Sequence, residues 1–280
     1  MAEIPASLVV KLRAMTNAGM MNCKQALVET NGNLEAAVDL LRKKGLAMAN
    51  KKALCEAKEG VIAQYIAPDS RLGVLVEVNC QTDFVAKNDT FRAFSEEVAR
   101  TLAANPKTDL EAIRTTQVAK LGENIRIPRF QRWEVQGNGL LAAYIHTGAK
   151  VGVLAEVGAG LPATVTHDDF KQLVRDITLQ IAAASPIAVS RDQVDPALIA
   201  KEKEIAAEQV KNKPPQAIAK IIEGKLEKYF QTMCLIDQGY VKKNGEISVK
   251  EYVQTIAKPL GDEIAIRRFV RFQVGEMPAA

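Results

Sequence analysis

The chain has 280 residues, of which 48% are hydrophobic and 25% are charged, and its formal net charge at pH 7 is +4. These values are ordinary for a globular protein, and the length exceeds what one small core requires, so we expect two or more domains. Because 37 basic residues are offset by 33 acidic ones, the charge gives only weak support for a nucleic-acid partner.

Cysteine spacing and hydropathy indicate the cellular compartment in which the protein is expected. The four cysteines are widely separated and form no C-x-x-C pair, so neither a zinc site nor a disulfide framework is indicated. The N-terminus has no basic segment followed by a long apolar stretch, and no apolar run is long enough to span a membrane. We expect a soluble cytoplasmic protein with free thiols and no membrane partner.

Residues 4–46 show three short amphipathic helical patterns, which predict a compact three-helix module over residues 1–50. Asn22, followed three positions later by Gln25, is a variant of the capping box that would begin the second helix. Gly45, after two lysines, is typical of a helix stop. The lysine-rich stretch that follows predicts a separate linker helix over residues 51–59.

Met20 and Met21 lie in a predicted turn between the first two helices. Both methionines could fill the small core of the module. Because thioether side chains are adaptable and turns are exposed, one of them could instead contact a partner.

An internal repeat is the most informative feature of the sequence. Residues 60–78 align without gaps on residues 139–157 at an offset of 79, with nine of nineteen positions identical. Each copy predicts two β-strands joined as a hairpin, followed by an amphipathic helix at 91–104 or 170–184. Thr166 and Asp169 predict the cap of the second of these helices.

A second pair of segments predicts a third strand for each copy. LGENIRIPRFQRWEV, from Leu121, matches LGDEIAIRRFVRFQV, from Leu260, at eight of fifteen positions. Their arginines resemble an RNA-binding cluster in composition, but the aromatic residues between them follow strand alternation, which favours arginines that cover a sheet. The four positions concerned are Arg129, Arg132, Arg268 and Arg271.

The third-strand segments are separated by 139 residues, whereas the hairpins are separated by 79. The second copy therefore has 60 extra residues between its helix and its last strand. Residues 196–230 read as two amphipathic helices separated by Lys213-Pro214-Pro215, which predicts a projecting helical hairpin. The hairpin could pack on its own subdomain, or it could contact a partner or a second copy of the chain. The fold class that we predict is α+β, with three N-terminal helices and a duplicated core of antiparallel sheets.

Thr82-Asp83-Phe84-Val85 occurs in only one of the two copies. At the same offset the second copy has Leu161 to Thr164 within a GAGLPAT loop, so the tetrapeptide is not needed to build the unit. Thr82 could cap a short helix while Phe84 and Val85 pack beneath it. Alternatively, a loop tip on a rigid scaffold offers one acid and one aromatic anchor to a partner.

Several motifs together resemble the bacterial elongation factor Ts family. They are LVEVNCQTDFVAKN, the stretch RAMTNAGMMNCKQAL near the N-terminus, GENIRIPRF before the midpoint and RFQVGE near the end. The resemblance covers essentially the whole chain. It implies a ubiquitin-associated-like (UBA-like) N-terminal module, a two-subdomain core and an inserted coiled-coil hairpin.

The same resemblance implies a guanine-nucleotide exchange factor for elongation factor Tu in its GDP-bound and nucleotide-free forms, in translation elongation. Such a protein does no bond chemistry and needs neither a cofactor nor a metal ion of its own. The family's TDFV loop, which disturbs magnesium in the GTPase, maps onto Thr82, Asp83, Phe84 and Val85. A further family contact maps onto Arg13, Met20 and Met21 of the N-terminal module.

The resemblance is weaker at two places. The chain ends five residues after Gly275, so we expect no extra C-terminal helical module. The insertion matches least well, and a dimer through it is an open expectation. The predicted division of the chain is a helical module at 1–50, a linker at 51–59, core subdomains at 60–137 and 138–275, and a tail at 276–280.

Two other classes of function fit the sequence less well. An enzyme finds little support, because the chain has no GxxxxGK[ST], no HExxH and no credible triad. Its two histidines, His146 and His167, lie in different predicted elements, and His146 fits a surface or partner-contact position better than a catalytic one. An RNA-binding scaffold would show strongly salt-dependent affinity for RNA, but we expect no direct nucleic-acid partner.

Overall fold

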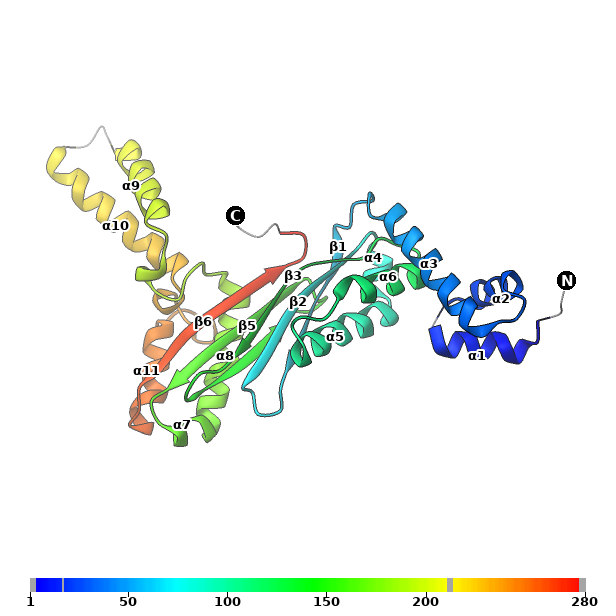
Figure 1. Cartoon of the computed structure of the whole chain (residues 1–280). Helices are drawn as coiled ribbons and strands as arrows, with labels where there is room; N and C mark the ends of the chain where they lie inside the picture. Colours follow the sequence, from blue (N-terminus) through cyan, green and yellow to red (C-terminus); the bar gives the residue numbers. More distant parts are fainter. Residues whose placement is uncertain (1–3, 17, 211–213, 277–280) are drawn as a thin grey trace.

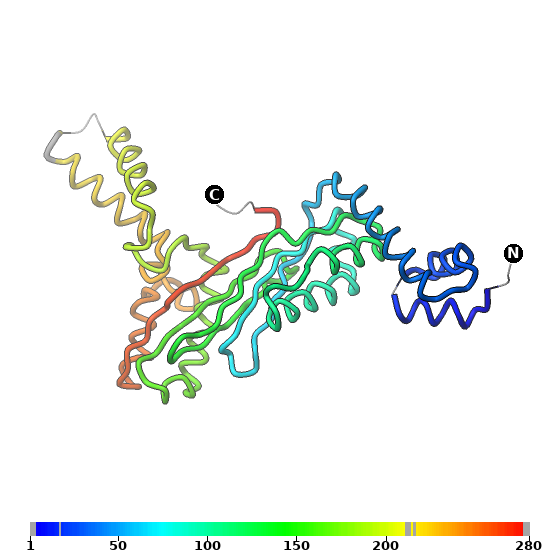
Figure 2. The backbone as a smooth tube through the Cα atoms, viewed as in Figure 1, coloured from blue at the N-terminus to red at the C-terminus, as the bar shows by residue number. Residues whose placement is uncertain are grey.

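The computed structural model describes residues 4–16, 18–210 and 214–276. Its architecture is mixed α+β: three N-terminal helices precede two antiparallel sheets of three strands each (Figure 1). Figure 2 shows the N-terminal helices at one end of the molecule, the helical hairpin at the other and the two sheets between them, and the chain returns from the hairpin to the second sheet. The predicted fold class is confirmed.

The three N-terminal helices are α1 (Ala6–Thr16), α2 (Met20–Glu29) and α3 (Leu34–Lys52). Their shared core includes Leu12, Cys23 and Leu27, all fully buried. The predicted cap at Asn22 is wrong. Helix α2 begins two residues earlier, at Met20, and its N-cap Gly19 provides no side-chain hydrogen bond.

Helix α3 does not stop at Gly45, contrary to the prediction. Gly45 is buried against α6 (Leu110–Leu121), where an added Cβ would lie 3.3 Å from the Cβ of Ala119. The glycine therefore permits close contact between two helices, and this packing outweighs its weak helix propensity.

The predicted linker helix at 51–59 is also wrong, because α3 ends at Lys52 and strand β1 begins at Glu59. The chain turns after Lys52, whose carbonyl accepts a hydrogen bond from the Cys55 amide at 2.8 Å. The Cys55 carbonyl in turn accepts from Asn124 Nδ2 at 2.7 Å. These contacts fix the connector in a non-helical conformation, which local helix propensity could not reveal.

The first sheet has the order β1-β2-β3, with all neighbours antiparallel. Its strands are β1 (Glu59–Ile66), β2 (Leu72–Cys80) and β3 (Arg126–Glu134). Helix α5 (Asp89–Ala104) covers one face and buries Phe91, Val98 and Leu102 against it. The hairpin, the helix and the third strand were predicted, whereas α6 was not.

The second sheet repeats this plan, with the order β4-β5-β6. Its strands are β4 (Gly139–Ile145), β5 (Val151–Ala159) and β6 (Ile264–Gln273), and α8 (Asp168–Ala184) covers one face. The predicted cap formed by Thr166 and Asp169 is wrong, since His167 caps α8 by accepting from the Asp169 amide at 3.3 Å. Helix α11 (Val249–Leu260), with a capping box of Ser248 and Glu251, was not predicted.

The two sheets pack against each other in a reciprocal manner. The Ile62 amide donates to the Ala149 carbonyl at 2.7 Å, and the equivalent Leu141 amide donates to the Ser70 carbonyl at 2.8 Å. A Cβ added at Gly152 would lie 2.4 Å from Ile62 Cγ2, so glycine permits the close approach. Ile62, Leu75, Leu141, Leu154 and Phe272 are among the side chains of this shared core. The proposed boundary between residues 137 and 138 stays a prediction.

The strand arginines are held by contacts within the two core subdomains. Arg129 Nε donates to Glu77 and Arg268 Nε donates to Glu156, each at 2.7 Å. Arg132 Nε donates to the Ala103 carbonyl at 3.2 Å. These contacts favour the interpretation that the arginines cover the sheets.

The predicted helical hairpin is present as α9 (Pro196–Val210) and α10 (Pro215–Met233), and it projects from the body (Figure 1). Lys213, part of the predicted turn, lies outside the described residues. At the base, Arg191 pairs with Glu227 of α10 at 2.6 Å and with Asp237 at 2.7 Å. Within the described part of the chain, no helix is long and apolar enough to cross a membrane.

Candidate functional site

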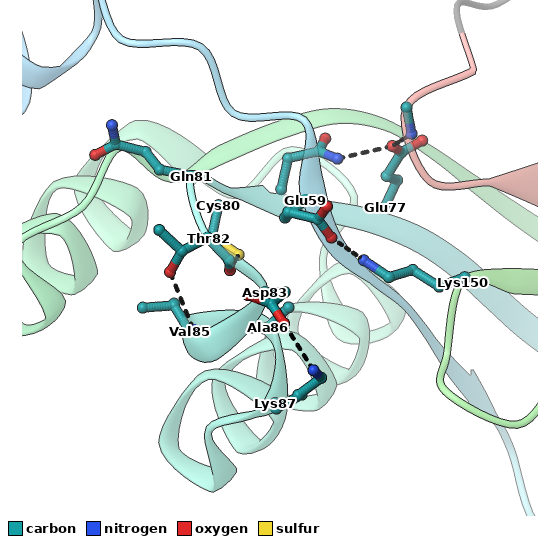
Figure 3. Close-up of polar contacts among 12 residues, drawn as sticks. Glu59, Glu77, Cys80, Gln81, Thr82, Asp83, Val85, Ala86, Lys87 and Lys150 are labelled. Carbon is teal, nitrogen blue, oxygen red and sulfur yellow. Dashed lines mark hydrogen bonds and ion pairs between the residues drawn. The ribbon is translucent and has the colours of Figure 1, made fainter.

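The tetrapeptide Thr82-Asp83-Phe84-Val85 lies immediately after β2 and opens the short helix α4 (Asp83–Lys87). Thr82 is the N-cap, and its hydroxyl accepts a hydrogen bond from the Val85 amide at 3.3 Å (Figure 3). Ala86, in the same helix, is buried in the core of the first subdomain. The loop is thus a helical turn attached directly to a central strand, which gives it a rigid support.

Thr82 is held from several directions. Its amide and its hydroxyl both donate to the carboxylate of Glu123, at 3.1 and 2.7 Å. Its carbonyl accepts from the thiol of Cys80 at 3.2 Å. Burial, with the negative charge of Glu123 nearby, raises the pKa of the Cys80 thiol to about 12, so this donor stays protonated at neutral pH.

Phe84 is in a different environment from its neighbours, because 80% of its surface is exposed. Val85 is partly buried against the core of the first subdomain. The capping-and-packing interpretation is therefore correct for Thr82 and Val85, and it is wrong for Phe84. An aromatic side chain left in water on a rigid turn is unusual for a purely structural residue.

Asp83, the residue before Phe84, is half-buried, with 47% of its side chain exposed. Its carboxylate pairs with the ammonium group of Lys87, one helical turn further on, at 2.7 Å (Figure 3). This hydrogen bond lowers the pKa of Asp83 below the usual value, so the carboxylate is ionised at neutral pH. The turn therefore presents an anionic group and an aromatic ring to solvent side by side.

The second copy contains the same turn with different side chains. Helix α7 (Pro162–Thr166) follows β5, and its N-cap Leu161 provides no side-chain hydrogen bond. Pro162 and Ala163 stand where the first copy has Asp83 and Phe84. The backbone turn belongs to the repeated fold, whereas the acid and the aromatic ring belong to one copy only.

The predicted N-terminal contact residues are accessible. Arg13 is exposed on α1, and Met20 and Met21 open α2 with 42% and 72% of their surfaces exposed. The alternative in which both methionines fill the small core is wrong. The methionines also lie within the first turn of α2, not in the preceding turn as predicted.

His146 lies in the turn between β4 and β5, and its side chain is exposed. Its Nδ1 is 3.1 Å from the hydroxyl of Tyr144. The structure thus brings Thr82, Asp83, Phe84 and Val85 together in one turn. It places His146 in the turn between β4 and β5, and Arg13 in the N-terminal helices. In the residues that the structure describes, no group of three His, Cys, Asp or Glu side chains could hold a metal ion.

Sequence reasoning missed Glu123, the residue that holds the turn. One signal was available, because Glu123 aligns with Asp262 when the two third-strand segments are superposed. An acidic residue just before the third strand is therefore common to both copies. The hydrogen-bond partner of Glu123 could not be deduced from the sequence, because Glu123 and Thr82 are 41 residues apart.

Comparison with known protein families finds a match that covers most of the chain. The family model described as elongation factor TS matches residues 81–276, a span that begins at the loop and ends after β6. The chain belongs to the elongation factor Ts family. Membership in a translation elongation factor family confirms the resemblance found in the sequence.

Full-length relatives support the assignment to the elongation factor Ts family. Elongation factor Ts of Nostoc punctiforme is 41% identical over 295 aligned positions, which cover 99% of this chain and 94% of that protein. The proteins of the same name from Symbiobacterium thermophilum and Nautilia profundicola are 42% and 43% identical. Each match covers 99% of this chain, and they cover 93% and 94% of those proteins.

Proposed function

We propose that this protein is a guanine-nucleotide exchange factor that acts on elongation factor Tu in the cytoplasm. It binds the GDP-bound GTPase, promotes release of GDP and leaves a nucleotide-free complex to which GTP can bind. It makes and breaks no covalent bonds, carries no cofactor or metal ion, and has no nucleic-acid or membrane partner. Membership in the elongation factor Ts family supports the choice of partner.

The observation that carries this proposal is the exposure of Phe84 on a turn whose backbone is fixed. Phe84 is 80% exposed, while Thr82, two residues earlier, is held by Glu123. A rigid aromatic anchor loses little conformational entropy on binding, which is the property of an interface hot spot. Phe84 acts as a wedge that enters an apolar gap beside the nucleotide site of the GTPase.

Asp83 has an electrostatic role at the nucleotide site of the GTPase. A GTPase holds the phosphates of GDP with backbone amides, a lysine and a magnesium ion. The ionised carboxylate of Asp83 competes for hydrogen-bond donors there, and the turn displaces the metal that opposes the phosphate charge. A ten-thousandfold faster release requires a barrier that is lower by about 5.5 kcal/mol. A wedge supported by an extended interface is sufficient for this.

A second contact is proposed at the N-terminal helices. Arg13, Met20 and Met21 are accessible there, and methionine side chains adapt to an apolar partner surface. This contact anchors the GTPase while the loop acts on its nucleotide site. His146, exposed in the turn between β4 and β5, is proposed as a weaker contact.

The hairpin of α9 and α10 leaves two roles open. Leu198 and Ile205 of α9 are 44% and 42% exposed, so an apolar surface is available to the GTPase or to a second copy of the chain. Sedimentation of the protein alone separates the two roles. A dimer that Ile205→Glu converts to a monomer supports the second role, and a monomer at all concentrations excludes it.

The proposed function is tested with elongation factor Tu loaded with fluorescent GDP. Release is followed after excess unlabelled GDP is added, with and without this protein. We expect release to accelerate at sub-stoichiometric amounts, because an exchange factor turns over. No acceleration at stoichiometric amounts would contradict the proposal. Tight RNA binding that weakens steeply with salt would then favour the RNA-binding scaffold.

A further inference from the structure

Glu123 is half-buried between α6 and β3, next to the turn that carries Asp83 and Phe84. Its carboxylate accepts three hydrogen bonds from two successive residues of that turn. The Gln81 and Thr82 amides donate to Oε2 at 3.0 and 3.1 Å, and the Thr82 hydroxyl donates to Oε1 at 2.7 Å. Hydrogen bonds to an ionised acceptor are among the stronger ones in proteins.

The main chain around Glu123 is fixed as well. Gly122 ends α6 in the left-handed conformation, with φ of 73°, and turns the chain toward the loop. The next amide, that of Asn124, donates to the side-chain oxygen of Gln81 at 3.0 Å. The two segments are therefore joined in both directions: Glu123 accepts from the loop, and Asn124 donates to it.

The second copy uses the same device with an aspartate. Asp262 accepts from the amides of Gly160 and Leu161 at 3.1 and 2.9 Å, and from the hydroxyl of Thr164 at 2.5 Å. Asp262 aligns with Glu123, and Gly160 and Leu161 align with Gln81 and Thr82. The turn that Asp262 holds carries Pro162 and Ala163, so it has neither an acid nor an aromatic ring to present.

Glu123 determines where Phe84 stands. Thr82 is both the residue that Glu123 binds and the N-cap that begins α4, so the position of Thr82 sets the start of the helix. Phe84 lies two residues further on and its ring is mostly exposed, so its position follows the backbone of the turn, which Thr82 holds on one side and Val85 and Ala86 anchor to the core on the other. A shift of about 1 Å in a group that acts on a reaction site can cost two orders of magnitude in rate.

We propose that Glu123 is a positioning residue for nucleotide exchange, which holds the turn so that Asp83 and Phe84 enter the nucleotide site of the GTPase. The proposal rests on the proposed function of that turn. It assigns to Glu123 a role in the rate of GDP release, beyond support of the fold. The acid of the second copy supplies a matched control, because Asp262 makes the same type of contact to a turn without these side chains.

The test compares Glu123→Gln with Asp262→Asn in the full chain. Each change keeps the size of the side chain and removes the negative charge. We expect Glu123→Gln to lower the maximal rate of GDP release by about tenfold, the factor that corresponds to one weakened charge-assisted hydrogen bond. The concentration for half-maximal rate stays nearly unchanged, because the N-terminal contact remains. Asp262→Asn keeps the maximal rate within about twofold, the range expected of a change away from the interface.

A double-mutant cycle with Thr82→Val isolates the contact between Glu123 and the hydroxyl. If both residues act through this contact, the combined loss of rate is smaller than the product of the single losses. An unchanged maximal rate in Glu123→Gln would overturn the proposal. Equal losses of rate in Glu123→Gln and Asp262→Asn would also overturn it, because they would show general support of the fold.

Amide hydrogen exchange of the protein alone separates this proposal from the proposed function. Glu123→Gln is expected to speed exchange at Gln81 and Thr82 and to leave Gly160 and Leu161 unchanged. Unchanged protection at Gln81 and Thr82 would overturn the positioning role whatever the release assay shows. Suppose that protection falls as expected in Glu123→Gln but the wild-type protein does not accelerate GDP release from the GTPase. The proposed function would then be wrong, and the role of Glu123 in the exchange rate would be overturned with it.

Discussion

The guanidinium of Arg129, on β3, lies 4.4 Å from the centre of the Phe272 ring, on β6 of the other sheet. The reciprocal contact joins Arg268 to Trp133 at 4.6 Å. Each arginine also pairs with a glutamate of its own sheet, Glu77 or Glu156. The repeated sequence thus forms a two-fold-like interface in which each copy contributes an arginine and an aromatic ring.

This interface predicts that the two arginines differ in their effect on stability. Glu77 has only 2% of its side chain exposed, and Arg129 is its one arginine partner in the described part of the chain, whereas Glu156 pairs with both Arg267 and Arg268. Removing the only cationic partner of a buried carboxylate costs about 3 kcal/mol of unfolding free energy. Arg129→Ala is therefore expected to lose about 3 kcal/mol, and Arg268→Ala less than half of that.

Urea unfolding measures both losses. The matched control is Arg126→Ala, at an exposed position of the same strand, with an expected change within about 0.5 kcal/mol. Equal losses of unfolding free energy in Arg129→Ala and Arg268→Ala would show that the number of arginine partners of each glutamate does not matter.

Phe84 is predicted to matter for exchange and not for stability. Phe84→Ala removes an exposed ring, so the melting temperature should be nearly unchanged. The loss of an interface anchor worth about 2 kcal/mol should slow GDP release by roughly thirtyfold. The contrasting variant is Phe91→Ala, at a fully buried position of α5, which should lose about 3–5 kcal/mol of unfolding free energy. A large drop in the melting temperature of Phe84→Ala would restore the packing role for this side chain.

Asp83 and Phe84 are predicted to contribute separately. Asp83→Asn keeps the shape of the side chain and removes the charge that competes for donors in the GTPase. We expect slower GDP release with an unchanged melting temperature, because the ion pair with Lys87 is exposed. Lys87→Ala is the control, since it breaks the same ion pair and leaves the carboxylate in place. If Lys87→Ala slowed release as much as Asp83→Asn, the ion pair and not the free carboxylate would be the active feature.

Asp176 on α8 predicts a dependence of stability on pH. Its carboxylate accepts from Lys242 at 2.6 Å, Tyr252 at 2.8 Å and Tyr240 at 2.9 Å. Burial acts to raise the pKa of Asp176, but these hydrogen bonds outweigh it and hold the pKa below its usual range. Because the folded pKa is depressed, this stabilisation is present above the unfolded pKa and is lost as the pH falls through the folded value.

The comparison of wild type with Asp176→Asn measures that stabilisation. The difference in unfolding free energy is expected to be about 1–3 kcal/mol at pH 7 and to shrink as the pH falls below about 4. Urea unfolding at several pH values gives the difference at pH 7 and its decrease at low pH. A difference that stays constant down to pH 3 would show that the charge of Asp176 contributes nothing.

Local patterns in the sequence predicted much of this structure, and long-range contacts account for the rest. The repeat predicted both hairpins and both third strands, because strand alternation and glycine positions are local signals. The end of α3 was mispredicted because Gly45 packs against Ala119, far along the chain. Comparison of the two copies singled out Thr82 to Val85 as candidates, but only the structure showed that Thr82 and Val85 support the turn while Phe84 is exposed.

The central claim is that this protein and GDP weaken each other's binding to elongation factor Tu. Linkage requires the two effects to be equal in magnitude. The most direct measurement is therefore a calorimetric titration of this protein into nucleotide-free and GDP-bound elongation factor Tu. The account predicts that GDP weakens the binding by at least about tenfold, and by the same factor with which this protein weakens GDP. Equal affinities for the two forms of the GTPase would contradict it.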